Sequence, residues 1–318
     1  MRIQRSVPHA ASSSVALTIG NFDGVHLGHQ AMLARLRAVA AARGLRTCAM
    51  TFEPHPREFF APDQAPTRLT SLREKLELLS QHGVEQVQVC RFDYGLAQTS
   101  AEEFIERILV RGLGARWILV GDDFRFGKRR AGDFVMLKQY APQLGYEVEA
   151  MASVVDAGER VSSTAVRNAL AAGELEQAAH LLGRTYSISG RVVHGDGLGR
   201  KLGFPTANVQ MKHNRPPLFG IYAVELCGVG PVPLRGVASL GVRPTVKAGG
   251  RPVLEVHVFD WNEDLYGRHV RVDFMRKLRD EEKYVDLDTL VRQIALDVEH
   301  AKEYFRARDS AALRKAQG

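Results

Sequence analysis

The stretch from Val15 to Gln30 reads VALTIGNFDGVHLGHQ, and it decides the fold of the first half of the chain. Its first five residues, VALTI, form a short apolar run that predicts a buried strand. A helical pattern then runs from Gln30 to Arg43, and Gly44 is the residue type that commonly ends a helix. The glycine-rich loop therefore joins the carboxyl end of a strand to a helix, which predicts the first unit of an α/β fold.

Short apolar runs and amphipathic helical patterns continue to alternate as far as Gly183, with further strands expected at residues 47–52, 86–92, 117–120 and 148–154. Two helix starts have the serine-to-glutamate spacing of a capping box, and a glycine follows each helix as its expected end. These residues are Ser71 with Glu74 and Gly83, and Ser100 with Glu103 and Gly112. The pattern predicts a Rossmann-like parallel sheet covered by helices.

The chain changes character after Gly183. Strand-like runs at residues 221–226, 254–259 and 269–274 are separated by glycine and proline clusters, which predicts an antiparallel β-barrel or sheet. Apolar residues then recur at helical spacing between residues 287 and 308, which predicts a C-terminal helix packed on the β structure. A chain of 318 residues is also long for a single core. We therefore expect two domains, residues 1–184 and 185–318.

Composition and charge narrow the class of protein. The chain is 45% hydrophobic and 25% charged, as soluble globular proteins usually are. Its net charge of +7 could attract nucleic acid, an acidic membrane or ATP, but the densest basic run, residues 128–130, is typical of a solvated loop. The three cysteines lie far apart, and Asn21 and Asp23 interrupt the first apolar stretch. We expect a cytoplasmic protein without nucleic-acid or membrane partners, and the sequence leaves its oligomeric state open.

His26 and His29 stand in the loop that opens the first helix, with Gly28 between them. A helix N-terminus offers free N–H groups and partial positive charge to a phosphate, and open parallel sheets bind ligands beyond the carboxyl ends of their strands. Two imidazoles there could hydrogen-bond phosphate oxygens, and Gly28 would let the backbone approach a triphosphate. The two histidines could instead be half of a metal site, or they could be loop residues without a binding role. The position between strand and helix favours the phosphate site.

Three further segments could line a ligand site at the same edge of the sheet. TFEPHP, residues 51–56, places proline turns around His55 and could shape a pocket. GDDFRFG, residues 121–127, offers carboxylates and aromatic rings to a nucleotide or a flat ring, although alone it is also compatible with a turn. RVSST, residues 160–164, enters a helix with three hydroxyls and has Arg167 one turn later, which alone describes an ordinary helix cap.

Together and in this order, GNFDGVHLGH, TFEPHP, GDDFRFG and RVSST resemble the FMN adenylyltransferase module of bacterial bifunctional FAD synthetases, within the HxGH nucleotidylyltransferase superfamily. The resemblance covers nearly all of residues 15–184. It implies that a phosphate oxygen of FMN attacks the α-phosphorus of ATP and that pyrophosphate leaves, assisted by Mg²⁺. Catalysis would depend on positioning and charge stabilisation, without a protein nucleophile.

The same resemblance implies roles for individual residues. Catalysis would fall to His26, His29 and Arg167. The ATP phosphates would be bound by Gly20, Phe22, Gly24, Gly28, Ser162, Ser163 and Thr164. The flavin would contact His55, Pro56, Asp123 and Phe124, although members of the family can have asparagine at the position of Asp123.

A second glycine-rich segment, GDGLGRKLG at residues 195–203, opens the second domain. Its glycines could form a backbone nest around phosphates or simply allow a tight hairpin turn, and the segment is neither a Walker A loop nor a GxGxxG motif. Thr206 and Asn208 follow two residues apart in an extended segment, so their oxygens point to one side. Such a pair can hold a hydrated Mg²⁺ beside nucleotide phosphates, which favours the phosphate site.

GRKLGFPTAN, residues 199–208, is similar to the signature of riboflavin kinases. GVRPT at 241–245, LEVHVFD at 254–260 and DLYG at 264–267 add to this resemblance. It implies that Glu255 accepts the proton of the riboflavin 5′-hydroxyl as that oxygen attacks the γ-phosphorus of ATP, with His257 and Asp260 as weaker candidates. RKLRDEEKY at 276–284 resembles the segment that closes over flavin, with Tyr284 where phenylalanine is usual.

The riboflavin kinase resemblance also implies which residues bind ATP, Mg²⁺ and the flavin. The phosphates of ATP would be bound by Gly195, Gly199, Lys201 and Gly203. Mg²⁺ would be held by Thr206 and Asn208, and the flavin would contact Leu265, Tyr266, Arg276 and Glu282.

We therefore expect a bifunctional enzyme that phosphorylates riboflavin to FMN and then adenylylates FMN to FAD, with ATP as the co-substrate of both steps. A different HxGH adenylyl- or cytidylyltransferase with an unrelated β domain would leave GRKLGFPTAN unexplained. An RNA-binding or flavin-sensing protein that kept both folds and lost its chemistry is a third interpretation, because fold alone does not guarantee function. The presence of all the key residues argues against it.

Overall fold

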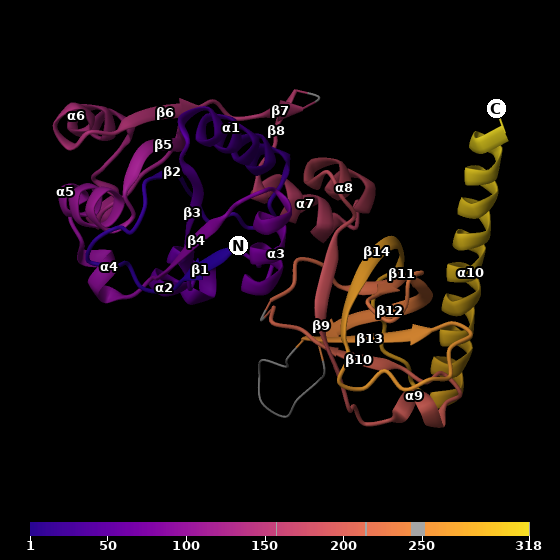
Figure 1. Cartoon of the computed structure of the whole chain (residues 1–318). Helices are drawn as coiled ribbons and strands as arrows, with labels where there is room; N and C mark the ends of the chain where they lie inside the picture. The colour runs from indigo at the N-terminus through magenta and orange to yellow at the C-terminus, as the bar shows by residue number, and fades with distance from the viewer. Residues whose placement is uncertain (157, 214, 243–251, 318) are drawn as a thin grey trace. The chain divides into compact units, whose positions relative to one another are not determined.

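The computed structural model describes residues 1–156, 158–213, 215–242 and 252–317. They form two compact units (Figure 1). One unit comprises Met1–Pro66 and Thr70–Ser163, and the other comprises Thr67–Leu69 and Thr164–Gly318. The α/β domain and the following β-barrel with a terminal helix are confirmed, whereas the boundary after Arg184 stays a prediction. Residues 243–245 of the GVRPT motif lie outside the described residues.

The first unit is built on a six-stranded parallel sheet with the order β1-β4-β3-β2-β5-β6. The strands are β1 (Arg2–Gln4), β2 (Val15–Ile19), β3 (Arg46–Glu53), β4 (Gln86–Arg91), β5 (Ala115–Gly121) and β6 (Glu147–Met151). After β2 the chain adds β3 and β4 on one side and β5 and β6 on the other, while β1 pairs with β4 at the edge. The loops that follow β2 and β5 therefore diverge at a topological switch point, where such sheets bind ligands.

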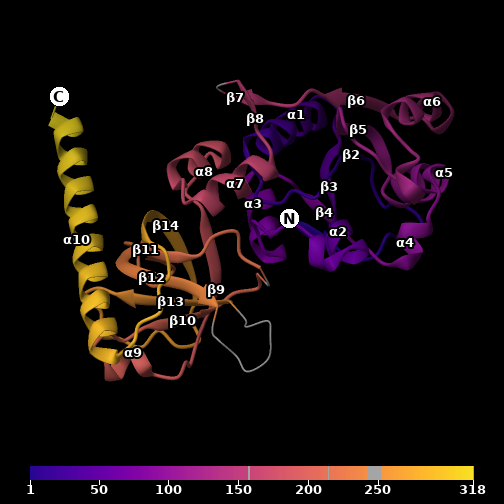
Figure 2. The same ribbon diagram turned by 180° about the vertical axis from the view of Figure 1, so that it is seen from behind.

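Alternate residues of the central strands β2 and β5 are buried against helices on opposite faces of the sheet. Ala16 and Trp117 pack with α1 (Leu27–Arg43) and α3 (Leu72–Gln81). Leu17 and Ile118 pack with the helical segment formed by α5 (Ala101–Glu103) and the π-helical η2 (Phe104–Gly112), and with α6 (Phe134–Leu144). Figure 2 shows the same three layers from behind. The smaller elements are α2 (Pro56–Phe60), η1 (Pro62–Gln64), α4 (Tyr94–Gln98), η3 (Lys128–Arg130), β7 (Val155–Asp156) and β8 (Glu159–Arg160).

Local signals in the sequence locate most of these elements. Val15–Ile19 matches its prediction to the residue. Both bonds of the predicted capping box form at Ser71, whose hydroxyl accepts from the Glu74 N–H while the Glu74 carboxylate accepts from the Ser71 N–H. Gly44 ends α1 in the left-handed conformation, with φ 63°. The helix begins at Leu27, three residues earlier than predicted, and β1 was not predicted at all.

The two edges of the sheet are β1 and β6. β1 has only three residues. β6 is connected to α1 by two ion pairs, in which Arg35 binds Glu149 at 2.8 Å and Arg43 binds Glu147 at 2.6 Å.

The second unit is a closed antiparallel barrel with the order β10-β13-β12-β11-β14-β9. Its strands are β9 (Ser187–Val193), β10 (Ala207–Gln210), β11 (Gly220–Cys227), β12 (Leu234–Val242), β13 (Pro252–Val258) and β14 (His269–Arg279). The helices are α7 (Ser163–Ala172), α8 (Leu175–Leu182), α9 (Leu198–Lys201) and α10 (Leu287–Gln317). α10 runs along the outside of the barrel in both views and extends beyond the predicted end at residue 308.

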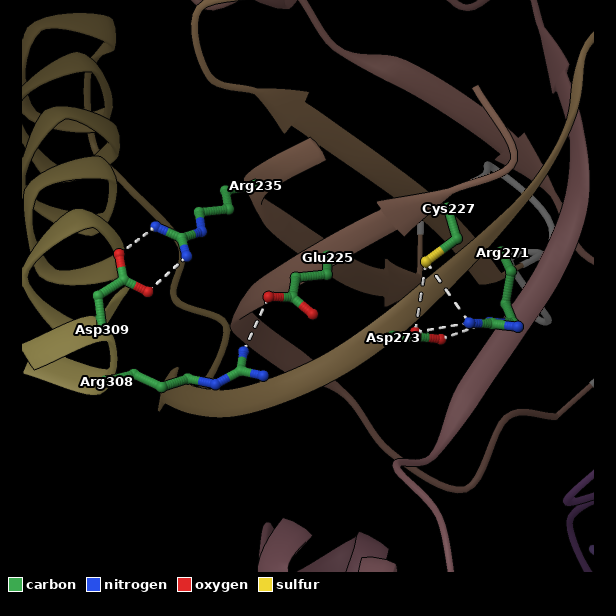
Figure 3. Close-up of polar contacts among 7 residues, drawn as sticks. All are labelled: Glu225, Cys227, Arg235, Arg271, Asp273, Arg308 and Asp309. Carbon is green, nitrogen blue, oxygen red and sulfur yellow. Dashed lines mark hydrogen bonds and ion pairs between the residues drawn. The ribbon is translucent and has the colours of Figure 1, made fainter. Parts of the chain in front are cut away.

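α10 is held to the barrel by apolar packing and by arginine–carboxylate pairs. Phe305, which is 2% exposed, packs with Ile221 and Val237. Toward the end of the helix, Asp309 accepts two hydrogen bonds from Arg235, and Arg308 donates to Glu225 at 2.8 Å (Figure 3). Nearer its start, Asp297 accepts two hydrogen bonds from Arg279 of β14 at 2.8 and 2.7 Å.

Replacing Asp297 with alanine should destabilise the second unit by about 2 kcal/mol. The variant leaves the guanidinium of Arg279, whose side chain is 19% exposed, without its carboxylate, and an unpaired charge that is largely buried is costly. The urea midpoint of the unfolding transition measures the effect. Asp309→Ala breaks a pair of the same type whose carboxylate side chain is 49% exposed, so its midpoint should move much less. Equal shifts for the two variants would contradict this account.

Candidate active sites

The first unit contains a cleft of about 300 Å³ at the switch point of its sheet. Nine residues that the sequence analysis singled out line it together: Gly20, Phe22, His26, Gly28, His29, Asp123, Phe124, Ser162 and Ser163. Gly24 is buried in the same loop, and Thr164 and Arg167 belong to the second unit. His55 and Pro56 are not among the residues that line this cleft.

The two histidines of the HxGH motif stack on each other. Their ring centroids lie 3.8 Å apart at an interplanar angle of 24°, and the ring of Phe22 lies 5.1 Å from that of His29. Burial, then the neighbouring charges of His26 and Lys75, lowers the pKa of His29 well below its usual value of 6.5. His29 is therefore neutral at pH 7, and its imidazole can serve as a hydrogen-bonding group for a ligand.

Gly28 packs closely against the histidine pair itself. A Cβ atom at this position would lie 3.1 Å from Cε1 of His26 and 3.5 Å from the carbonyl oxygen of Val161. A side chain would therefore force the His26 ring to shift by a few tenths of an ångström. This contact is a structural reason for glycine at position 28, in addition to the predicted approach of the backbone to a triphosphate.

The loop between β2 and α1 has an unusual backbone conformation. Phe22 and Val25 have positive φ angles of 48° and 41°, and Gly24 has φ 81°. Positive φ is costly for residues with a side chain, so it persists where surrounding contacts hold it. Two of these contacts come from hydroxyls, because Thr51 donates to the carbonyl of Asn21 at 3.2 Å and Ser163 donates to that of Asp23 at 2.9 Å.

Three other predicted residues of this site form polar contacts with other residues of the chain. Asp123 forms an ion pair with Arg160 at 2.7 Å. His55 caps α2, since its Nδ1 accepts a hydrogen bond from the N–H of Arg57. Within the second unit, Arg167 of α7 donates from Nε to the carbonyl oxygen of Thr67 at 2.6 Å.

A larger cleft of about 650 Å³ lies in the second unit. The predicted residues that line it are Gly195, Gly199, Thr206, Asn208, Glu255, His257, Tyr266 and Glu282. Lys201, Gly203, Leu265 and Arg276 are not among its lining residues, and Arg276 lies on β14 with its guanidinium 5.7 Å from the ring of Tyr304.

Strand register places the proposed base beside the proposed metal ligand. Glu255 of β13 is directly opposite Asn208 of β10 on one side and Ser239 of β12 on the other. All three side chains therefore point to the same face, which is the face of the cleft. The oxygens of Thr206 and Asn208 are hard donors, and such a pair fits Mg²⁺, which keeps several waters and is shared with substrate phosphates.

The glycine-rich loop of the second unit packs directly on the Thr206–Asn208 pair. A Cβ atom at Gly195 would overlap the amide group of Asn208, and one at Gly199 would lie 2.5 Å from the carbonyl oxygen of Phe204 and 3.1 Å from the hydroxyl oxygen of Thr206. Glycine at these two positions is therefore needed for the loop to cover the pair. From the sequence, these glycines were interpreted only as a phosphate-binding nest or as a tight turn, and their packing on Thr206 and Asn208 was not predicted.

Of the two weaker candidates for the base, His257 also lines the cleft. The Nδ1 of His257 lies 2.9 Å from the carbonyl oxygen of Pro205, and because a carbonyl can only accept, this nitrogen carries the hydrogen. Asp260 is exposed and is not among the cleft-lining residues.

Sequence reasoning missed Glu281, Arg279 and Asp297, which also line the cleft. The hydroxyl of Ser239 donates to Glu281 at 3.4 Å, and burial raises the pKa of the Glu281 carboxyl. Gly241 leaves space for this carboxylate, because a Cβ atom there would overlap it. Glu281 and Arg279 lie inside the quoted RKLRDEEKY segment, but the motif alone does not indicate which of its side chains point inward.

Comparison with known proteins agrees with this geometry. A family model described as FAD synthetase matches residues 9–165, and one described as riboflavin kinase matches residues 182–305. The bifunctional riboflavin kinase/FMN adenylyltransferase of Escherichia coli (strain K12) is 49% identical over 300 residues, which are 94% of this chain and 96% of the relative. The protein of that name from Haemophilus influenzae is 44% identical over 292 residues, or 92% of this chain and 94% of the relative.

A solved structure has the same fold over almost the whole chain. The crystal structure of a protein titled macrolide-efflux protein, from Streptococcus pneumoniae, has a TM-score of 0.78 and 29% identity, and covers 93% of this chain and 97% of its own. Among the residues described here, no helix is both long enough and apolar enough to span a membrane. On the two matching domains and the identity to relatives along nearly its full length, the chain belongs to the family of bifunctional riboflavin kinase/FMN adenylyltransferases.

Proposed function

We propose that the chain phosphorylates riboflavin to FMN in the cleft of the second unit and adenylylates FMN to FAD in the cleft of the first. The observation that carries the proposal is that each compact unit contains its own cleft, lined by residues of the motif that its reaction requires. We also propose that the functional domains are residues 1–184 and 185–318, and that the enzyme works in the cytoplasm with small molecules as its partners.

Adenylyl transfer needs little covalent help from the protein. His26 and His29 bind phosphate oxygens of ATP at the start of α1, Ser162, Ser163 and Thr164 bind further phosphate oxygens, and Arg167 stabilises charge on the departing pyrophosphate. A neutral imidazole still carries one N–H group, so His29 can donate a hydrogen bond to a phosphate oxygen. The flavin is assigned to the side of the cleft where Asp123 and Phe124 lie.

Riboflavin phosphorylation needs a base and a metal-held triphosphate. Glu255 accepts the proton of the 5′-hydroxyl while that oxygen attacks the γ-phosphorus of ATP. Thr206 and Asn208 would hold Mg²⁺, which would supply charge neutralisation at the phosphates, and the loop with Gly195, Gly199, Lys201 and Gly203 would face the triphosphate. Leu265, Tyr266, Arg276 and Glu282 are assigned to the flavin.

Chromatography of the products tests both activities. The purified chain, incubated with riboflavin, ATP and Mg²⁺, should yield FMN and then FAD, and a parallel sample that starts from FMN should yield FAD. Formation of FMN from riboflavin without any FAD, together with no FAD from added FMN, would contradict the adenylyltransferase. Formation of FAD only from added FMN would contradict the kinase.

A further inference from the structure

We infer that Thr70 is a positioning residue for adenylyl transfer, because it fixes the backbone of the loop that carries the HxGH histidines. The inference rests on the proposed function of the first cleft. Thr70 is outside every motif that the sequence analysis identified, and it is not among the residues that line the cleft. It lies immediately before Ser71, the residue that caps α3.

Thr70 makes three hydrogen bonds to two consecutive residues of the loop. Its N–H and its hydroxyl both donate to Oδ1 of Asp23, at 3.0 and 3.1 Å. Its hydroxyl oxygen accepts from the N–H of Gly24 at 3.1 Å. Thr70 and Asp23 are 4% and 5% exposed, so these bonds are shielded from water. The hydroxyl is thus used both as donor and as acceptor, which only serine or threonine can reproduce at this position.

These bonds hold the part of the loop that sets the position of the histidines. Asp23 and Gly24 lie between Phe22 and Val25, the residues of this loop that have side chains and adopt positive φ. Val25 is followed directly by His26, and the buried ring of Phe22 lies against His29. A loop that relaxed toward negative φ at these residues would move both imidazoles. Thr70 therefore acts on catalysis through the backbone and does not need to touch a substrate.

The size of the effect follows from the type of catalysis. A reaction accelerated by positioning loses about 100-fold in rate when a reacting or stabilising group moves by about 1 Å. Thr70→Val removes the hydroxyl at nearly constant volume and keeps the N–H bond to Asp23. We expect this variant to reduce kcat for FAD formation by about 10- to 100-fold. Thr70→Ser keeps both roles of the hydroxyl and should stay within about threefold of the wild type.

Ser71→Ala is the matched control for loss of stability. It removes the hydroxyl that caps α3 at the next residue and leaves all three bonds of Thr70 in place. Loss of an N-cap costs about 1 kcal/mol of stability, so this variant should unfold at a lower urea concentration. The folded variant should form FAD at the wild-type rate. Formation of FMN from riboflavin in the second unit should be unchanged in every variant and serves as an internal standard in each assay.

Histidine NMR gives a readout that does not depend on turnover. In Thr70→Val the ring signals of His26 and His29 should shift, whereas Thr70→Ser and Ser71→Ala should leave them near the wild-type positions. Wild-type rates and ring signals in Thr70→Val, or equal losses in Thr70→Val and Ser71→Ala, would overturn the inference. If Thr70→Val does not fold, Thr70→Ala removes the same hydroxyl without adding a methyl group and takes its place. Absence of FAD formation by the wild type would instead contradict the proposed function.

Discussion

Replacing Glu255 with glutamine should lower kcat for riboflavin phosphorylation by about 10³-fold, the usual contribution of a general base. Glutamine keeps the size of the side chain and its place opposite Asn208, but it cannot take up the proton of the attacking hydroxyl. Because the substitution leaves the metal-binding pair intact, the KM for ATP should change by less than about threefold. FMN formation, followed by chromatography at saturating riboflavin, measures both constants.

Glu225→Gln is the matched control for this experiment. Glu225 also lies on a barrel strand, but it binds Arg308 of α10 and is not among the cleft-lining residues (Figure 3). This variant should phosphorylate riboflavin at the wild-type rate. FAD formation from added FMN should be unchanged in both variants. A fully active Glu255→Gln enzyme would assign the base to another group, and loss of both activities would contradict two separate active sites.

Replacing His29 with alanine should reduce kcat for FAD formation from FMN by 10²- to 10³-fold, about the effect of deleting one group that stabilises a charged transition state. The variant loses the imidazole that stacks on His26 in the cleft, and it leaves the second unit untouched. Riboflavin phosphorylation by the same sample should therefore keep its wild-type rate. Release of pyrophosphate, measured by a coupled assay, reports the adenylyl transfer directly.

His300→Ala provides the comparison, because His300 is an exposed histidine of α10 outside both clefts. It should leave both activities unchanged. If His29→Ala instead retained FAD formation and lost FMN formation, the assignment of the two reactions to the two units would be reversed.

Elements that depend on neighbouring residues could be predicted from the sequence. The bounds of β2 follow from five consecutive buried residues, because an apolar run bounded by polar residues and glycine defines its own ends. The capping box at Ser71 is equally local, since both partners lie within one helical turn. The histidine pair was found for the same reason, as its loop directly joins a strand to a helix.

Contacts between segments that are distant in the sequence could not be predicted, because no pattern of neighbouring residues indicates them. Thr70 binds Asp23 across 47 residues of sequence, and no spacing rule connects them. In the barrel, irregular pairing between β11 and β14 near Ile221 and Ala223 interrupts the alternation of inward and outward side chains. The direction of each side chain near the end of β14 could therefore not be read from RKLRDEEKY, and Glu281 was passed over although it lines the cleft.

The open sheet of the first unit has a consequence for how the molecule behaves at high concentration. Exposed edge strands are templates on which strands of other chains can add, and that growth leads to aggregation. At one edge, β1 offers only three residues, and at the other the carboxylates of β6 are tied to Arg35 and Arg43. Short and charged edges make poor templates, so the sheet resists growth by strand addition, whereas closure of the barrel removes such edges altogether.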